Sequence, residues 1–187
     1  DATIEKRKKD QDDLYGSNSE FLYYFDLGCL NHYKRDFKES AANFAKAEQI
    51  YEDLYTKSVT NEAAAIVTND NTRPYRARPF ELLLMYEFQI LNYLAMMDLD
   101  GAMVEVRRSQ IAMNALYQKD KKKVNDNGLL RYLSALVYDL DGSPDDAAIA
   151  YINTVKAYKE GKLKVPNEVL EFVTEGLRHA DREDDLK

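Results

Sequence analysis

"DFKESAANFAKA", residues 36–47, is the stretch of this sequence that decides the fold. Small residues recur along it, and one large aromatic residue, Phe44, stands between them. Two later stretches repeat this order of small and bulky positions: DLDGAMVEVRRS (98–109) and SPDDAAIAYINT (143–154). Small residues on one face of a helix allow a neighbouring helix to approach closely. We therefore predict three antiparallel helix hairpins whose second helices begin at these stretches.

Three positions match in each stretch. A small residue is followed four positions later by a bulky one, and three positions after that by another small one. In chain order the sets are Ser40, Ala102 and Ala147; Phe44, Val106 and Tyr151; and Ala47, Ser109 and Thr154. With Leu27-Gly28 on the preceding helix, this spacing resembles the tetratricopeptide repeat, a unit of two antiparallel helices. The resemblance implies an all-α, tetratricopeptide-like right-handed superhelix of about three helix hairpins with a C-terminal capping helix.

Apolar periodicity along the chain predicts the domain organisation. We expect Ser19 and Ser143 to cap helices, Pro144 to occupy a first helical position and Gly161 to end a helix. A short helical piece is expected at 61–67. The expected segments are a charged N-terminal arm or frayed helix (1–18), a single helical domain (19–181) with hairpins at 19–58, 80–118 and 128–160, an insert (59–79), a capping helix (166–181) and an acidic tail (182–187).

Composition and charge exclude several classes of protein. The 187 residues are 45% hydrophobic and 32% charged, which is typical of a helical globular protein and too apolar for a disordered one. A net charge of -7 argues against nucleic-acid binding, because phosphate contacts need a basic face. No apolar run approaches the roughly 20 residues that span a bilayer, so no transmembrane segment is expected.

Few residues could carry catalysis or bind a metal. The only histidines, His32 and His179, lie far apart and lack zinc-ligand spacing. Cys29 lies three positions before His32, but no orienting acid or oxyanion site accompanies the pair. DLDGSPDD (139–146) is interpreted as a turn and a helix start rather than a calcium loop, because the helix restarts too early. We therefore expect no enzyme activity, no cofactor and no metal site.

The stretch TNDNTRPYRARPFE, residues 68–81, holds the candidate binding residues. Pro74 and Pro79 bias the residues before them toward extended backbone, so alternate side chains should point apart. Two interpretations stay open: the arginines pair with Glu81, Glu87 and Glu105 and fasten the insert, or they bind an anion or a partner's carboxylate. The candidate partner- or anion-binding residues are Asn69, Asp70, Arg73, Tyr75, Arg76, Arg78 and Glu81 of the loop, with Arg107 and Arg108 further along the chain.

LYTKSVTNEAAAIVTNDNTRPYRARPFE (54–81), followed by ILNYLAMMDLDGAMVEVRRSQ (90–110), resembles a lipoprotein-like family of bacterial envelope proteins without an established activity. The resemblance implies a periplasmic location, an association with the outer membrane, and a lipid anchor outside this chain. The main hypothesis is a non-catalytic scaffold or adaptor that binds other proteins of an envelope assembly, such as a flagellar or cell-wall machine. An apolar groove is expected to hold a partner helix and to include Leu22, Phe25, Cys29, Leu84 and Leu91. The alternative is a protein that binds an anionic small ligand or glycan through Arg73, Arg76 and Arg78.

Overall fold

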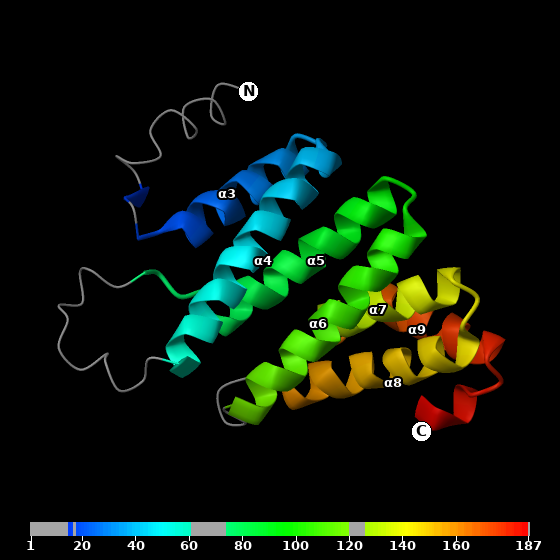
Figure 1. The fold of residues 1–187 in the computed structure, drawn as a ribbon. Coiled ribbons are helices and arrows are strands. Elements are labelled where there is room, and N and C mark those ends of the chain that lie inside the picture. Colours follow the sequence, from blue (N-terminus) through cyan, green and yellow to red (C-terminus); the bar gives the residue numbers. More distant parts are fainter. Residues whose placement is uncertain (1–14, 17, 61–73, 120–125, 187) are drawn as a thin grey trace. The chain divides into compact units, whose positions relative to one another are not determined.

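In the computed structural model, the chain is described for residues 15–16, 18–60, 74–119 and 126–186 (Figure 1). These residues form α-helices and one short 3-10 helix and contain no β-strand, so the predicted all-α class is confirmed. The helix predicted at 61–67 lies outside the described residues. The elements are α3 (Glu20–Tyr33), α4 (Phe37–Thr60), α5 (Pro79–Ala95), α6 (Leu99–Lys119), α7 (Gly128–Leu140), α8 (Pro144–Glu160), α9 (Asn167–His179) and η2 (Glu183–Leu186).

The described helices belong to two compact units. Unit 1 ends at Phe88 and unit 2 begins at Gln89, so the boundary falls inside α5. Unit 1 contains α3, α4 and the first part of α5. Unit 2 contains the last turns of α5 and the helices from α6 onward.

The core of unit 1 is built around the ring of Phe44, which is fully buried. The ring stacks on Phe88 with centroids 5.7 Å apart and meets Phe25 edge-on at 5.8 Å. A Cβ atom at Gly28 would come within 2.6 Å of this ring, so α3 can lie this close to α4 only with glycine there. The Ser40 hydroxyl of α4 donates to the Gly28 carbonyl at 2.8 Å, which joins the same two helices.

The core of unit 2 joins α7, α8 and α9. Small residues on α7 and α8 surround one large side chain, Tyr151, of which 1% is exposed. A Cβ atom at Gly176 of α9 would lie 2.1 Å from the Tyr151 ring. The capping helix therefore meets α8 at a glycine. The other buried residues of this core are Ala135, Ala147, Ala148, Ala150, Val155, Val169, Val173 and Leu177.

The three hairpin turns share one backbone conformation. Each places a left-handed residue after its first helix, at Arg35 (φ 67), Met97 (φ 58) and Gly142 (φ 75). The next residue then donates its main-chain N–H to a carbonyl five positions earlier, the bond that closes a Schellman motif. These bonds run from Asp36 to Asn31, from Asp98 to Tyr93 and from Ser143 to Tyr138, each at 2.9 Å. Only one of the three left-handed residues is glycine.

The predicted residues occupy the helix ends: Ser19 and Ser143 are N-caps, Pro144 begins α8 and Gly161 follows its last residue. Their capping contacts differ from those expected. Neither serine side chain makes a capping hydrogen bond. The Ser143 hydroxyl instead donates to Asp141 at 3.1 Å. Gly161 follows α8 in a right-handed conformation, and Lys162 (φ 55) supplies the left-handed residue.

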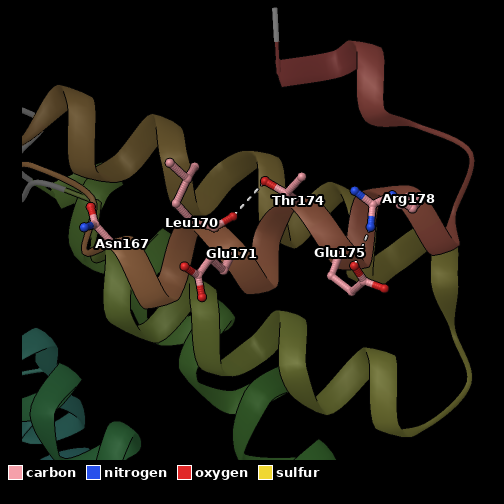
Figure 2. A pocket seen from close by; sticks show the side chains of 6 residues that line it. All are labelled: Asn167, Leu170, Glu171, Thr174, Glu175 and Arg178. Carbon is pink, nitrogen blue, oxygen red and sulfur yellow. Dashed lines mark hydrogen bonds and ion pairs between the residues drawn. The ribbon is translucent and has the colours of Figure 1, made fainter.

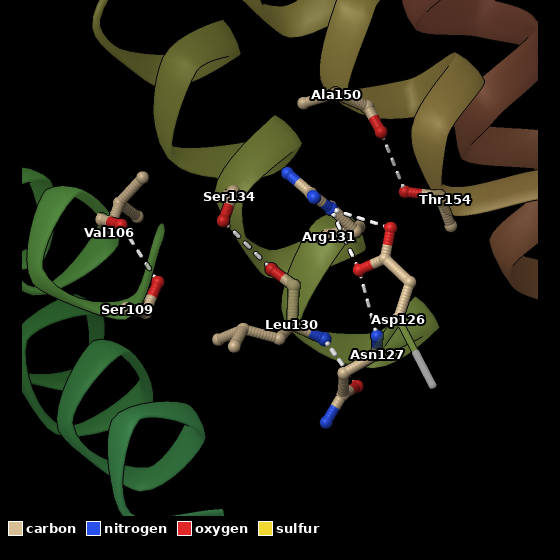
Figure 3. Close-up of polar contacts among 9 residues, drawn as sticks. All are labelled: Val106, Ser109, Asp126, Asn127, Leu130, Arg131, Ser134, Ala150 and Thr154. Carbon is tan, nitrogen blue, oxygen red and sulfur yellow. Dashed lines mark hydrogen bonds and ion pairs between the residues drawn. The ribbon is translucent and has the colours of Figure 1, made fainter. Parts of the chain in front are cut away.

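All nine matched positions of the three stretches are buried, none with more than 1% of its surface exposed. Each polar residue among them has a partner for its hydroxyl: Ser40 donates to Gly28 of α3, whereas Ser109 and Thr154 bond within their own helices (Figure 3). Ser109 donates to the Val106 carbonyl at 2.7 Å and Thr154 to the Ala150 carbonyl at 2.9 Å. These small residues can therefore lie in the core without an unsatisfied polar group.

Candidate functional site

The described part of the predicted arginine loop is Pro74–Arg78, here called the arginine segment. It forms neither helix nor strand, and exposure alternates along it. Tyr75 and Ala77 are half-buried, whereas Arg76 and Arg78 are exposed. This alternation is the one expected from the two prolines. Asn69, Asp70 and Arg73 lie outside the described residues.

Tyr75 attaches the arginine segment to unit 1. Its main-chain N–H donates to the Asn18 carbonyl at 2.6 Å, and its ring stacks on Phe21 with centroids 6.3 Å apart. Its hydroxyl lies 2.7 Å from both carboxylate oxygens of Glu81. Burial, and then the hydrogen bond and charge of Glu81, raise the Tyr75 pKa to about 12, against an opposing effect of Arg78. The phenol therefore remains a hydrogen-bond donor across the physiological pH range.

Glu81 also organises the start of α5. Its carboxylate accepts the main-chain N–H of Arg78 at 2.7 Å, and its own N–H donates to the Arg78 carbonyl at 3.0 Å. Arg78 is thus the N-cap, and Pro79 takes the first helical position, where its missing N–H has no cost. Glu81, three residues after the cap, provides the acidic half of a capping box. The sequence Arg-Pro-Phe-Glu contains this signal, which was not among the predicted helix starts.

Among the described residues, Arg76 and Arg78 do not pair with the glutamates proposed to hold them. Within the described part of the chain, neither Arg76 nor Arg78 forms an ion pair, and both are exposed. The carboxylate of Glu81 receives the Tyr75 hydroxyl and a main-chain N–H. Glu87 and Glu105 are buried, with 7% and 3% of their surfaces exposed. Pairing of Arg76 or Arg78 with Glu81, Glu87 or Glu105 is therefore not observed in the described part of the chain. Tyr75, by contrast, attaches the segment to unit 1.

Arg107 and Arg108 lie on α6 in unit 2. Arg107 is exposed. Arg108 forms an ion pair with Glu105 of the same helix at 3.5 Å, and half of its side chain is exposed. Within unit 2 these two residues form part of an ordinary charged helix surface.

Of Cys29 and His32, the residues considered for catalysis, the first is half-buried and the second packs against other side chains of unit 1. Burial, reinforced by the charge of Asp26, raises the Cys29 pKa to about 12, so the thiol is not activated as a nucleophile. His32 packs edge-on against Phe88, with centroids 4.7 Å apart, and against Phe37 at 5.6 Å. No group of three or more His, Cys, Asp or Glu side chains in the described residues could hold a metal ion.

The acidic stretch at 139–146 has contacts that fit a turn. Asp139 accepts the Tyr151 hydroxyl at 3.3 Å, which ties α7 to α8, and Asp141 accepts the Ser143 hydroxyl. Asp145 and Asp146 lie in the first turn of α8, where negative charge is favourable. Each of these carboxylates therefore has a position or a contact that belongs to the hairpin of α7 and α8.

One face of α7 carries apolar side chains that the core only partly covers. This face, here called the α7 stripe, consists of Leu129, Tyr132, Leu136 and Leu140 at spacings of three and four. Tyr132 and Leu136 pack partly against the core of unit 2, whereas Leu129 and Leu140 are 41% and 65% exposed. The apolar groove predicted from the sequence lies on earlier helices and does not include this stripe. The same spacing rule applied to 129–140 would have found it.

A shallow hollow lies on the outer face of α9, lined by Asn167, Leu170, Glu171, Thr174, Glu175 and Arg178 (Figure 2). Its one arginine is paired on the surface, because Arg178 contacts Glu175 at 2.6 Å and Glu183 at 2.8 Å. Thr174 donates to the Leu170 carbonyl of its own helix. The hollow is therefore a polar helix surface and is not built as a binding site.

Comparison with protein-family models, with curated proteins and with solved structures found no match to this chain. In the described residues, no helix has both the length and the apolar character needed to cross a membrane. Function must therefore be inferred from the chain's own residues, and two features stand out: the α7 stripe and the exposed arginines of the arginine segment.

Proposed function

We propose that this chain is a non-catalytic scaffold or adaptor that binds other proteins through tetratricopeptide-like helix hairpins. The observation that carries the proposal is the α7 stripe, an apolar helix face with two exposed leucines. Exposed apolar residues at spacings of three and four are the usual contact between a helix and a partner helix. In paired-helix repeats, the exposed concave surface is the common site for a protein partner.

The equivalence of the hairpins supports the repeat interpretation. Each of the three turns has one left-handed residue, followed by a residue whose N–H donates to the carbonyl five positions earlier. The residues at the matched positions after each turn are buried. Repeated units of this kind bury their cores against each other and have surfaces available for binding. A stacked, right-handed arrangement of the hairpins is part of this proposal.

The partner is proposed to be another protein of a bacterial envelope assembly, in the periplasm and associated with the outer membrane. The resemblance of residues 54–81 and 90–110 to envelope proteins supports this location. No nucleic acid is expected, because the chain carries a net charge of -7.

The test is affinity purification of the full-length protein from the envelope fraction of its own cells, followed by mass spectrometry. A double variant, Leu129→Ser with Leu140→Ser, removes both exposed leucines of the α7 stripe. The matched control is Ile149→Ser, which removes an exposed apolar side chain (50% exposed) from α8 in the same unit. The helical content of each variant is checked by circular dichroism.

The proposal predicts that specific proteins are recovered with the wild-type chain and the control, and are lost with the double variant. Recovery of the chain alone would contradict an adaptor function. Equal recovery of partner proteins with the wild type, the double variant and the control would be consistent with an adaptor function but would exclude the α7 stripe as the binding surface.

A second candidate function is binding of an anionic small ligand or glycan through the arginine segment. The observation that favours it is the exposure of Arg76 and Arg78, without an ion pair to any described residue, on a segment fixed by Tyr75. Guanidinium groups held in this way suit carboxylate, sulfate or phosphate oxygens.

Thermal unfolding in sulfate or phosphate, compared with chloride at equal ionic strength, tests this candidate. Stabilisation by the anion should disappear in Arg76→Ala with Arg78→Ala and persist in Lys156→Ala, which removes an exposed cation from α8. If the double variant is less stable in every salt by the same amount, the arginines are structural and the candidate fails.

A further inference from the structure

Asn127-Gly128 is the only Asn-Gly pair in the sequence, and it lies at the start of α7. In such a pair, the main-chain nitrogen of glycine can attack the side-chain amide carbon of asparagine. Glycine hinders this attack least because it has no side chain and has the greatest backbone freedom. The pair is therefore a candidate site of spontaneous deamidation.

The fold requires both residues. The Asn127 side-chain oxygen caps α7 by accepting the Leu130 N–H at 3.0 Å (Figure 3). A Cβ atom at position 128 would lie 2.4 Å from the Tyr158 ring of α8, so glycine allows the close contact. The reactive pair is thus a consequence of a helix cap and a close helix approach at adjacent positions.

The same contacts hold the pair away from reaction. The Asn127 side-chain oxygen is bound to Leu130, and its main-chain carbonyl accepts the Arg131 N–H at 3.0 Å. Asp126 adds a further link through its ion pair with Arg131 at 3.0 Å. Ring closure requires rotation of both the side chain and the peptide group of Asn127. Both hydrogen bonds must therefore break first, which means that the first turn of α7 must open.

We propose that Asn127 is a deamidation site whose reaction is controlled by opening of the first turn of α7. After opening, the Gly128 nitrogen loses its proton to hydroxide and forms a bond to the side-chain carbon of Asn127. The bond from that carbon to the amide nitrogen breaks as this nitrogen takes a proton from water, so that ammonia leaves and hydroxide is regenerated. Water then opens the cyclic imide at either carbonyl, which leaves aspartate or isoaspartate at position 127.

The two products affect α7 differently. Aspartate is also a good N-cap, so α7 keeps its start. Isoaspartate adds a carbon to the main chain and moves the side-chain carboxylate, so the capping bond to Leu130 is lost. The isoaspartate product therefore loosens the start of α7 irreversibly, next to the contact of Gly128 with Tyr158.

The experiment follows deamidation of the full chain at mildly alkaline pH in buffer and in denaturing urea. Proteolysis and mass spectrometry quantify the peptide containing position 127, and chromatography separates the two products. We expect the rate in buffer to be at least about tenfold lower than in urea, because the cap must open first. Asn127→Ser retains a capping side chain and should give no product at this site.

A second variant separates control by the helix from other effects. Leu133 of α7 is buried, with 4% of its surface exposed. Leu133→Ala should therefore favour opening of the first turn of α7 and raise the deamidation rate in buffer severalfold. Leu163→Ala removes an exposed side chain (64% exposed) and should leave the rate unchanged. Equal rates in buffer and urea would overturn control by the cap, and absence of product in urea would overturn the site itself. If Leu133→Ala fails to fold, its rate in buffer should equal the urea rate; a lower rate would contradict the proposal.

Discussion

The first hairpin, α3 with α4, and the third, α7 with α8, each bury an aromatic ring on the second helix, eight residues after the residue whose N–H closes the turn. The glycine that makes room for the ring lies on a different helix in each case. Phe44 lies against Gly28 of the preceding helix, α3. Tyr151 lies against Gly176 of the following helix, α9, and Ala135 takes the place that Gly28 has in the first hairpin. The position of the glycine therefore identifies the helix that the ring faces.

This difference separates two kinds of packing. Gly28 controls contact within one hairpin, whereas Gly176 controls contact between a hairpin and the capping helix. In both places the ring is fully or almost fully buried, so neither contact can relax toward solvent. Substitutions at the rings and at the glycines should therefore test the comparison directly.

The largest effect is expected from removal of the rings. Phe44→Ala and Tyr151→Ala should each lower the free energy of unfolding by about 3–5 kcal/mol, because each leaves a cavity in a closed core. Urea denaturation monitored by circular dichroism measures both. A loss below about 1 kcal/mol at either position would show that its ring is not a core element.

The next effect concerns the two glycines. Gly28→Ala and Gly176→Ala should each cost about 1–3 kcal/mol, since the added Cβ meets a packed ring. Combining Gly176→Ala with Tyr151→Leu should cost less than the sum of the single changes, because the ring is then absent. Additive costs would contradict the contact between Gly176 and Tyr151. Gly28→Ala with Phe44→Leu is the corresponding test in unit 1.

The sequence was sufficient to predict the helices and the matched buried positions, because small and bulky residues at fixed spacing report which face is buried. It was insufficient for the helix caps, because a serine before a helix does not guarantee a capping bond, as Ser19 and Ser143 show. The arginine segment was predicted only in part. Alternation of side chains followed from its prolines, but the role of Tyr75 depends on Asn18 and Phe21, which are distant in sequence.

A smaller effect is expected at the turns, where glycine is present in one hairpin and absent in another. Met97 has a φ of 58 with 91% of its surface exposed, so Met97→Gly should stabilise the fold by about 1 kcal/mol through relief of the left-handed conformation. Gly142→Ala, at a φ of 75, should destabilise it by a similar amount. Thermal unfolding of both variants checks the pair, and the same sign for both changes would contradict the shared turn geometry.

The smallest effect is expected at Tyr75. Tyr75→Phe removes the hydrogen bond to Glu81 and should cost about 0.5–1 kcal/mol, measured by urea denaturation near neutral pH. Because folding raises the Tyr75 pKa from 10.0 to about 12, the stability linked to its proton is fully present below pH 10 and is lost as pH rises through about 12. The stability difference between wild type and Tyr75→Phe should therefore shrink above pH 10. A difference that grows with pH would contradict this account.

The most direct test of the proposed adaptor function is the affinity of the purified chain for a partner recovered with it, measured by calorimetry. The account predicts that Leu129→Ser with Leu140→Ser weakens binding at least about tenfold, whereas Ile149→Ser binds like the wild type. Equal affinities for all three proteins, each correctly folded, would contradict the claim that the α7 stripe is the surface through which this protein works.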